Sequence, residues 1–256
     1  MSDPLISFCL VTKNHPEDLK YAIDKLFEHI GDIPFEVLIG DASDTPYVDA
    51  RCTVFHWDLN KNGNARAFNE LAKHAKGKYL TPFADDLECF PKCYERALKI
   101  METEPLECIG LFFVKRVDLG HVCQMNFLTL SNFIMRKEEW DRLGGFDWEV
   151  FPHHHSDYDL MQRVVRQRHK LLSLPGCCLI HKRSTVAPGQ NAEAAKRLTE
   201  KYPEGMVGHV NDFNLNTHVL CPSDHEHDQY IVNQGITFED RNGQALMFEH
   251  GELVKT

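Results

Sequence analysis

Residues 78–91, KYLTPFADDLECFP, join an apolar run to two adjacent carboxylates. The run up to Phe83 is typical of a buried strand, and Pro91 indicates the start of a helix. Asp85 and Asp86 therefore lie at the C-terminal edge of a strand, where open α/β sheets bind ligands. Because adjacent carboxylates repel each other, they favour a shared divalent cation, which in turn can hold phosphates. The other interpretation is that both are surface acids, or first-turn acids that a helix dipole favours.

The composition is that of a globular protein. The chain has 256 residues, of which 43% are hydrophobic and 26% are charged, and this length can bury a sizeable core. The formal net charge of -10 argues against a broad basic surface, because neutralisation of phosphates drives most nucleic-acid binding. Nucleic acid is therefore a disfavoured partner, although a local basic groove remains open.

The lack of recognisable targeting signals and the usage of cysteine predict a cytoplasmic protein. The sequence has no run of about 18 apolar residues, so it predicts no integral membrane segment. The N-terminal stretch MSDPLISFCL lacks the basic and apolar regions of a signal peptide. The nine cysteines are odd in number and lack the spacing of metal ligands, which favours reduced thiols over a disulfide framework.

The first part of the chain alternates strand and helix patterns. The expected strands are 6–12, 35–40 (ending at Asp41), 53–57 and 78–83. The expected helices are 15–29, 64–76 and 91–103. This βαβ alternation predicts an α/β fold with a mostly parallel, doubly wound sheet.

The pattern changes after residue 103. Two strand-like segments without a helix between them are expected at 109–117 and 127–136. Helices are then expected at 137–143, 156–169 and 190–201, with one further extended segment at 171–180. The extended segment contains Pro175-Gly176, which we expect to form a turn. Beyond Pro203 the chain is polar until a hairpin at 236–249 that turns at Asn242-Gly243. We expect one domain over residues 1–202 and a C-terminal extension over 203–256.

This order of segments resembles the GT-A glycosyltransferases, in particular the inverting family 2 that uses nucleotide-diphosphate sugars. The segment SFCLVTKN (7–14) is similar to the family's nucleotide-binding first strand. The segment EVLIGDASD (36–44) resembles its second strand, whose terminal acid contacts the nucleotide base. The resemblance therefore assigns Thr12 and Asp41 to the nucleotide. A carboxylate suits a base with an N–H donor, such as uracil or guanine; the alternative for Asp41 is a turn-forming residue.

A third match is NKNGNARAFNELAKHAKGKYL (60–80). It is similar to the family's Asn-X-Gly turn, which is followed by a helix with a small residue and an asparagine. The resemblance implies that Asn62 and Arg66 contact the nucleotide sugar. Arg66 and Asn69 are three positions apart and so share one face of the helix. A solvated surface position is the alternative for Arg66.

The segment FADDLE (83–88) resembles the family's acidic motif, in which three acids or Asp-X-Asp are common. Ala84 replaces the first acid here. The resemblance implies that Asp86 is a metal ligand and that Asp85 contacts the ribose or the metal. Hard oxygen ligands of this kind suit Mg²⁺ or Mn²⁺.

A late histidine completes the expected metal site. In CLIHKRST (178–185), His181 resembles the family histidine that approaches the metal or the diphosphate. The two basic residues after it are expected to add positive charge near the leaving group. The alternative is a structural histidine at a strand end.

The segment GGFDWEVFPHHHSDYDLMQRV (144–164) is similar to the family's Gly-Gly-Phe-Asp segment and the acids that follow it. The resemblance aligns Asp157 with the catalytic base. The other interpretation is a helix start, with Ser156 as N-cap and Asp157 and Asp159 as first-turn acids. Both interpretations can hold for Asp157, whereas Asp159 is expected to cap the helix. The preceding histidines, 153–155, either line the acceptor site or are solvated.

The resemblance implies a metal-dependent glycosyltransferase. The expected donor is a UDP-, GDP- or dTDP-sugar, the cofactor is Mn²⁺ or Mg²⁺, and the acceptor hydroxyl is recognised by loops in 118–156 and by the tail from 203. A nucleotidyltransferase is one alternative, but those enzymes usually carry a glycine-rich loop after the first strand, and TKNHPEDLK has no glycine. A non-catalytic sugar-nucleotide or carbohydrate-binding module is the other.

Overall fold

The centre of the sheet is the apolar strand β1 (Ile6–Thr12). A computed structural model of the chain pairs β1 in parallel with β2 (Phe35–Asp41) and β4 (Tyr79–Pro82), and β2 in parallel with β3 (Thr53–His56). The C-terminal ends of these strands therefore share one edge. The predicted parallel half is confirmed. The structure describes residues 3–116, 121–123, 133–167, 169–182, 190–205, 238–239, 245–249 and 252–255.

The second half of the sheet is mixed. Strand β8 (Phe133–Arg136) is antiparallel to β4 and to β6 (Cys108–Arg116). Strand β6 pairs antiparallel with β7 (His121–Cys123) and parallel with β9 (Lys170–His181). The full strand order is β12-β11-β10-β7-β6-β8-β4-β1-β2-β3, with β9 pairing β6 and β5 off this path.

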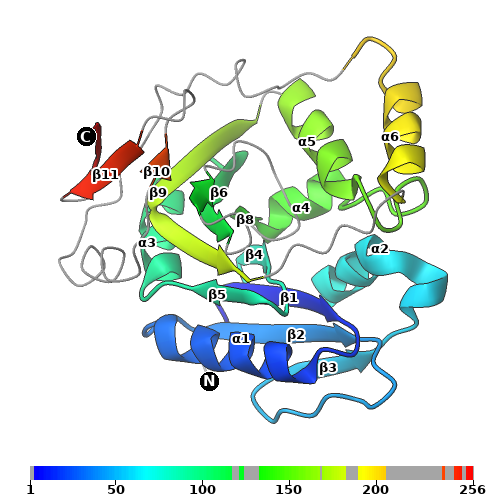
Figure 1. Cartoon of the computed structure of the whole chain (residues 1–256), viewed down its shortest axis with the longest axis horizontal. Coiled ribbons are helices and arrows are strands. Elements are labelled where there is room, and N and C mark those ends of the chain that lie inside the picture. Colours follow the sequence, from blue (N-terminus) through cyan, green and yellow to red (C-terminus); the bar gives the residue numbers. More distant parts are fainter. Residues whose placement is uncertain are drawn as a thin grey trace.

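Six described helices cover the sheet or flank it (Figure 1). Their bounds are α1 (Pro16–His29), α2 (Leu59–His74), α3 (Cys93–Met101), α4 (Lys137–Leu143), α5 (Ser156–Arg166) and α6 (Gln190–Lys201). Helix α2 begins earlier than expected because it includes a kink at Gly63, where φ is +67°.

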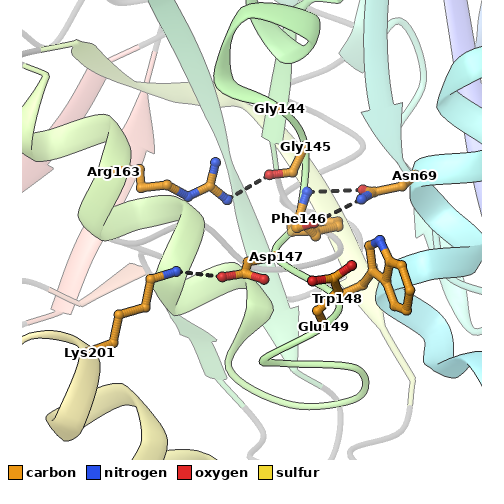
Figure 2. Close-up of a pocket in the computed structure, with 9 residues that line it drawn as sticks. All are labelled: Asn69, Gly144, Gly145, Phe146, Asp147, Trp148, Glu149, Arg163 and Lys201. Atoms are coloured by element: carbon orange, nitrogen blue, oxygen red, sulfur yellow. Dashed lines mark hydrogen bonds and ion pairs between the residues drawn. The ribbon is translucent and has the colours of Figure 1, made fainter.

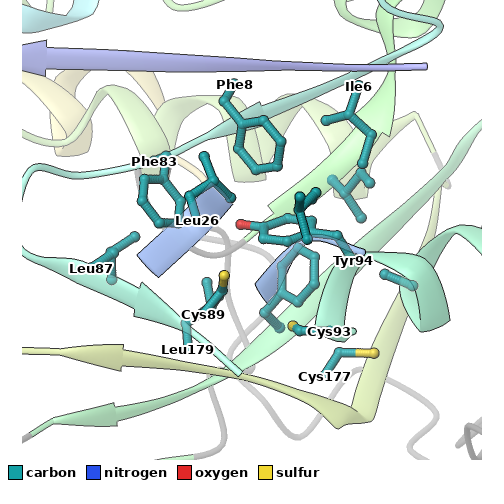
Figure 3. Packing of buried hydrophobic residues seen from close by; sticks show 14 of the residues in the cluster. Ile6, Phe8, Leu26, Phe83, Leu87, Cys89, Cys93, Tyr94, Cys177 and Leu179 are labelled. Carbon is teal, nitrogen blue, oxygen red and sulfur yellow. The ribbon is translucent and has the colours of Figure 1, made fainter. Parts of the chain in front are cut away.

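Alternation along β1 sends side chains to both faces of the sheet, which produces two cores. Phe8 faces the core that contains α1 and α3, where it makes edge-to-face contacts with Phe83 and Tyr94 at centroid distances of 5.8 Å and 4.7 Å (Figure 3). Cys9 faces the opposite core, which is built on α2, α4 and α5. Phe68 of α2 and Trp140 of α4 pack there at a centroid distance of 5.2 Å. The sheet is therefore covered by helices on both faces.

Two local features differ from the sequence prediction. Residues 87–89, directly after the acidic pair, form a short strand β5 (Leu87–Cys89) that pairs antiparallel with β9. The predicted turn at Pro175-Gly176 is wrong, because β9 continues through it with a shift in register. Phe112 pairs with Leu174, whereas the next residue of β6 pairs with Cys178. The extra residues form a bulge, which accommodates a proline inside a strand.

The C-terminal strands extend the same sheet. Strand β10 (Phe238–Glu239) pairs with β11 (Ala245–Glu249) as the predicted hairpin, and β11 pairs with β12 (Glu252–Lys255). The expected turn at Asn242-Gly243 lies outside the described residues. Among the helices that the structure describes, none is long and apolar enough to span a membrane.

Candidate functional site

Thr12 and Asp85 meet at the C-terminal edge of the parallel half. Thr12 is the last residue of β1, and Asp85 follows β4. The Thr12 hydroxyl donates a 2.7 Å hydrogen bond to Asp85 Oδ2. Thr12 is buried and Asp85 is half-buried, so the bond fixes one carboxylate oxygen at the rim of the sheet.

Asp86 and His181 face each other beside this pair. The pairing of β5 with β9 sets Leu87 opposite His181, and the Lys182 amide donates to the Asp86 carbonyl at 3.1 Å. His181 Nε2 lies 3.6 Å from Asp86 Oδ1, which is too far for a hydrogen bond. Both side chains keep some exposure, 24% for His181 and 11% for Asp86. Both side chains are therefore partly accessible to solvent.

The side chains of Asp86 and His181 suit a divalent cation. A carboxylate oxygen and an imidazole nitrogen are both ligands that Mn²⁺ accepts. His181 Nδ1 is buried and has no hydrogen-bond partner, so the protein leaves this ring without the outer partner that usually orients it. In the part of the chain that the structure describes, no group of three or more His, Cys, Asp or Glu side chains could hold a metal. A cation here would take its other ligands from substrate and water.

Lys182 lies on the outer side of the same strand pair. Its ammonium is 3.0 Å from the centre of the Tyr21 ring, and the Tyr21 hydroxyl donates to Glu88 at 2.9 Å. Burial lowers the pKa of Lys182, although the nearby carboxylate of Glu88 opposes this effect. Lys182, the first basic residue after His181, therefore packs against Tyr21 of helix α1.

Asp41 ends β2, in register with Thr12. Its side chain is fully buried. One carboxylate oxygen accepts the Ser43 amide at 2.9 Å and the other accepts the Tyr47 amide at 2.7 Å. This is the turn-forming geometry that the sequence left open, and it fixes the course of residues 41–47 beside the strand edge.

The start of α2 is pressed against the loop between α4 and α5 (residues 144–155, hereafter the α4–α5 loop). The Ala65 amide donates to the Pro152 carbonyl at 3.1 Å, and a Cβ on Gly63 would lie 2.2 Å from the same oxygen. Only glycine fits here. The Arg66 guanidinium stacks on Trp148 of the loop at 4.4 Å, so the solvated alternative for Arg66 is wrong. The side chain of Asn62 lies outside the described residues.

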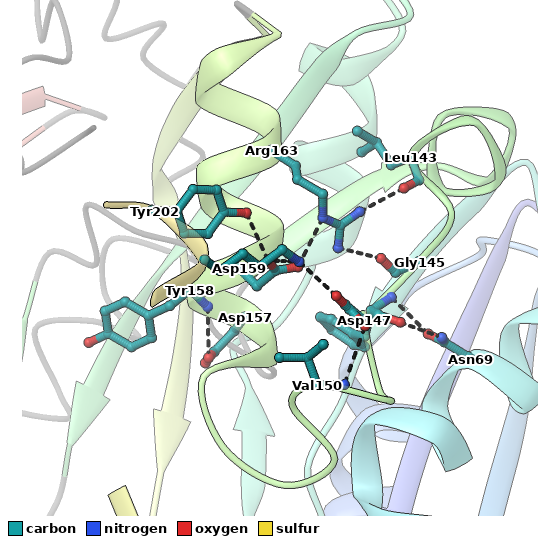
Figure 4. Close-up of polar contacts among 12 residues, drawn as sticks. Asn69, Leu143, Gly145, Asp147, Val150, Asp157, Tyr158, Asp159, Arg163 and Tyr202 are labelled. Atoms are coloured by element: carbon teal, nitrogen blue, oxygen red, sulfur yellow. Dashed lines mark hydrogen bonds and ion pairs between the residues drawn. The ribbon is translucent and has the colours of Figure 1, made fainter. Parts of the chain in front are cut away.

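Asp157 lies in the first turn of α5 and is half-buried. Its Oδ1 accepts the Tyr158 amide at 2.9 Å (Figure 4). The predicted N-cap at Ser156 is wrong: His155, with φ of +64°, precedes the helix, and Ser156 is its first residue. The Ser156 hydroxyl is buried without a hydrogen-bond partner.

Asp159 does not cap the helix as expected. It is fully buried and forms the centre of an ionic cluster (Figure 4). Arg163 Nε donates to its Oδ2 at 3.0 Å, and the Tyr202 hydroxyl donates to its Oδ1 at 2.8 Å. Lys201 Nζ lies 2.6 Å from the same Oδ1. A buried carboxylate with three partners is a structural anchor, because burial without them would be very costly.

A cavity of about 290 Å³ lies between the α4–α5 loop, α5 and α6 (Figure 2). Several polar groups around it bond to one another or to the backbone. Asn69 donates to the Phe146 carbonyl at 2.8 Å and accepts its amide at 2.9 Å. Arg163 donates to the carbonyls of Leu143 and Gly145, both at 2.6 Å. We therefore assign this cavity to the framework of the loop rather than to the acidic edge.

Residues 7–152 match the sequence model of glycosyl transferase family 2. The match covers more than half of the 256 residues. The chain belongs to glycosyl transferase family 2. The family match includes the strand edge with Thr12, Asp41 and the acidic pair, and it ends before α5 and His181.

Solved structures confirm the GT-A fold for this family 2 chain. The mannosyltransferase PcManGT from Pyrobaculum calidifontis, with GDP-Man and Mn²⁺, is 14% identical with a TM-score of 0.56, over 80% of this chain and 64% of that one. S. aureus TarS with UDP-GlcNAc is 15% identical with a TM-score of 0.57, over 71% and 59%. GalNAc-T7 with UDP, GalNAc and Mn²⁺ is 12% identical with a TM-score of 0.63, over 92% and 55%.

These similarities concern the fold alone, because every identity is low. The chain spans only 55% to 64% of the length of the three solved proteins. A comparison with curated protein sequences gave no match.

Sequence reasoning missed the residues that support the family 2 site. Trp148 follows the Gly-Gly-Phe-Asp segment, and its place beside Arg66 depends on how the α4–α5 loop packs on α2. Lys201 and Tyr202 are more than 40 residues from Asp159 in the chain, yet they complete its cluster. The only local signal for the cluster is the i,i+4 spacing of Asp159 and Arg163.

Proposed function

We propose that this protein transfers a sugar from a nucleotide-diphosphate donor to an acceptor hydroxyl, with inversion at the anomeric carbon and with Mn²⁺ or Mg²⁺ as cofactor. One observation carries the proposal. Thr12 is bonded to Asp85 at the same strand edge where Asp86 faces His181. Ligands bind at this edge of open α/β sheets. Membership of family 2 favours glycosyl transfer over nucleotidyl transfer as the reaction of that edge.

The donor nucleotide would lie along the ends of β1 and β2. Thr12 and Asp85 would contact its ribose, and the 41–47 turn held by Asp41 would border the base. Asn62 and Arg66 would face the diphosphate and the sugar from the start of α2. Arg66 has a rigid stacked guanidinium, and such a group suits phosphate oxygens. Two of the similar solved structures contain GDP-Man and UDP-GlcNAc, which supports a GDP- or UDP-sugar ahead of a dTDP-sugar.

Asp86 and His181 would hold the divalent cation. When bound, the cation would neutralise charge on the leaving nucleotide diphosphate, the Lewis-acid role of metals in catalysis. Two of the solved neighbours contain Mn²⁺, which supports manganese or a similar ion.

Asp157 would act as the general base. One of its carboxylate oxygens accepts the proton of the acceptor hydroxyl, whose oxygen then forms a bond to the anomeric carbon. The bond from that carbon to the diphosphate oxygen breaks, and the electron pair leaves with the diphosphate. The positive end of the α5 dipole favours the ionised carboxylate that this step needs.

A binding experiment tests the proposal. Nucleoside diphosphates are titrated into the protein with Mn²⁺ or with EDTA, and thermal unfolding is recorded. Ligand at 100 times its Kd stabilises the native state by about 2.7 kcal/mol, so UDP or GDP should raise Tm when Mn²⁺ is present. No shift with any nucleoside diphosphate would contradict the proposal. Slow Mn²⁺-dependent hydrolysis of the bound sugar nucleotide would separate an enzyme from a binding module.

A further inference from the structure

Lys201, in the last turn of α6, bridges two acids that flank Asp157. Its ammonium lies 2.7 Å from Asp147 Oδ2 (Figure 2) and 2.6 Å from Asp159 Oδ1. Asp147 is near the start of the α4–α5 loop, and Asp159 is two residues after Asp157. One lysine of α6 therefore links the α4–α5 loop to the first turn of α5.

Further contacts from α6 reach the same segment. The Arg197 guanidinium donates to the Val150 carbonyl at 3.1 Å. Phe151 of the loop packs in a buried cluster with Leu198 and Tyr202. Helix α6 therefore contacts the beginning, the middle and the end of the segment, and it lies outside the residues that match the family.

Helix α2 holds the loop from the other side. Asn69 forms two hydrogen bonds with the backbone of Phe146, and the Ala65 amide donates to the Pro152 carbonyl. With α2 on one side and α6 on the other, the position of Asp157 depends on both helices. The hydrogen bonds with α2 join neutral groups, and the Arg66 guanidinium adds a stacking contact with Trp148. The bridge from α6, in contrast, is an ion pair with two carboxylates.

We propose that Lys201 is a positioning residue that sets the place of Asp157 by bridging Asp147 and Asp159. The role of Asp157 as the base rests on the proposed function. The physical reason for the bridge is charge. Both carboxylates lie within hydrogen-bond distance of one ammonium, and without that ammonium they would repel each other. The loop would then lose its ionic link to α5 at Asp147, while the Arg163 hydrogen bonds to Leu143 and Gly145 would remain.

Hydrogen exchange tests the bridge without any substrate. Lys201→Met removes the charge and keeps most of the length of the side chain, whereas Lys201→Arg keeps the charge. Asp147→Asn removes the charge of the loop carboxylate and leaves the contact between Lys201 and Asp159 in place. Lys196→Met is the matched control on the same helix, because Lys196 is 68% exposed and, among the residues that the structure describes, its ion pair is with Glu200 of its own helix. Amides of residues 146–157 should exchange about 10-fold faster or more in Lys201→Met. Protection should return in Lys201→Arg and should be normal in Lys196→Met.

Unchanged exchange over 146–157 in Lys201→Met would overturn the bridge. Equally fast exchange in β1 and β4 would mean that the whole fold had loosened. In that case Asp147→Asn decides, because it leaves the buried Asp159 and its other partners intact: loss of protection confined to 146–157 supports the bridge, and normal protection contradicts it.

Kinetics test the positioning of Asp157. In Lys201→Met, kcat for transfer should fall about 10- to 100-fold, the scale of a small misplacement of a catalytic group. The donor Kd should stay unchanged, and Lys201→Arg should restore most of kcat. Faster exchange with a normal kcat would refute the positioning role. If the wild-type protein binds no sugar nucleotide, the proposed function fails while the exchange data still decide the bridge.

Discussion

Thr12 and Asp85 are 73 residues apart in the chain, yet the Thr12 hydroxyl donates a 2.7 Å hydrogen bond to Asp85 Oδ2. The bond joins the ends of β1 and β4, two neighbouring parallel strands. It orients one of the two adjacent acids while the next residue, Asp86, faces His181. Adjacent carboxylates with different partners can take different roles.

Thr12→Val removes the hydroxyl and keeps the shape of the side chain. We expect the free energy of unfolding to fall by about 0.5–1.5 kcal/mol, the usual net value of one hydrogen bond, and nucleoside diphosphate affinity to fall with it. Urea denaturation and calorimetry measure the two effects. Thr199→Val is the control, because that exposed hydroxyl donates to the Ala195 carbonyl of its own helix. If Thr12→Val binds nucleoside diphosphates with wild-type affinity, the Thr12–Asp85 pair is not part of the donor site.

Gly63 and Gly144 form a matched pair for the contact between α2 and the α4–α5 loop. Both have positive φ, +67° and +77°, but an added Cβ meets the Pro152 carbonyl oxygen at 2.2 Å at Gly63 and nothing within 4 Å at Gly144. Gly144→Ala should cost about 1–2 kcal/mol of stability for the left-handed backbone. Gly63→Ala should cost clearly more, because its ψ of 167° places it in a region that essentially only glycine adopts, and because the loop must also move. Equal losses in urea denaturation would show that the loop does not rest on Gly63.

Asp41→Ala should act through the turn that follows β2. Two backbone amides, those of Ser43 and Tyr47, lose their acceptor, and leaving a buried donor unpaired costs about 1–3 kcal/mol. We expect lower stability together with weaker donor binding, because residues 41–47 would no longer border the base. Asp32→Ala, at an exposed acid before β2, should change neither quantity. An unchanged donor Kd in a folded Asp41→Ala protein would separate Asp41 from the donor site.

Asp157→Asn keeps the shape of the side chain and removes its basicity. Donor binding should survive, whereas transfer should fall by roughly 10²–10⁴, the usual contribution of a general base. If Asp157 were only a first-turn helix residue, asparagine would be nearly neutral there. A transfer assay with the matched donor and acceptor decides. Turnover near the wild-type level would reject Asp157 as the base.

The tail gives a prediction about the acceptor. We expect residues 203–256 to serve acceptor recognition or subunit contact rather than donor binding. A chain truncated after Tyr202, if circular dichroism shows it folded, should bind nucleoside diphosphates with normal affinity. Complete loss of that binding in the folded truncation would contradict this division.

The sequence predicts most of the parallel half of the fold because its signals are local. Strand β1 alternates between two apolar faces, and the ends of β1, β2 and β4 carry polar residues that the parallel arrangement brings to one edge. Strand β5 was missed because three residues after an acidic pair have no periodicity to read. The turn expected at Pro175-Gly176 failed because a bulge accommodates both residues inside β9.

The candidate site was predicted unevenly for the same reason. Asp85, Asp86 and Asp157 belong to short motifs, so their positions on elements could be inferred from the sequence. The partners of Asp159 come from Arg163, Lys201 and Tyr202, and the last two reach it only through the packing of α6 against the α4–α5 loop. The capping role expected for Asp159 was wrong because tertiary ion pairs outcompete a local cap.

The central claim is that Asp86 and His181 support a cation-dependent nucleotide-diphosphate site, and calorimetry of UDP and GDP tests it most directly. Titrations of the wild type, Asp86→Ala and the exposed-site control Asp141→Ala are compared with Mn²⁺ and with EDTA. We predict that the wild type and Asp141→Ala bind one of the two nucleotides far more tightly with Mn²⁺, and that Asp86→Ala loses this dependence while staying folded. Undiminished Mn²⁺-dependent affinity in Asp86→Ala would contradict the account.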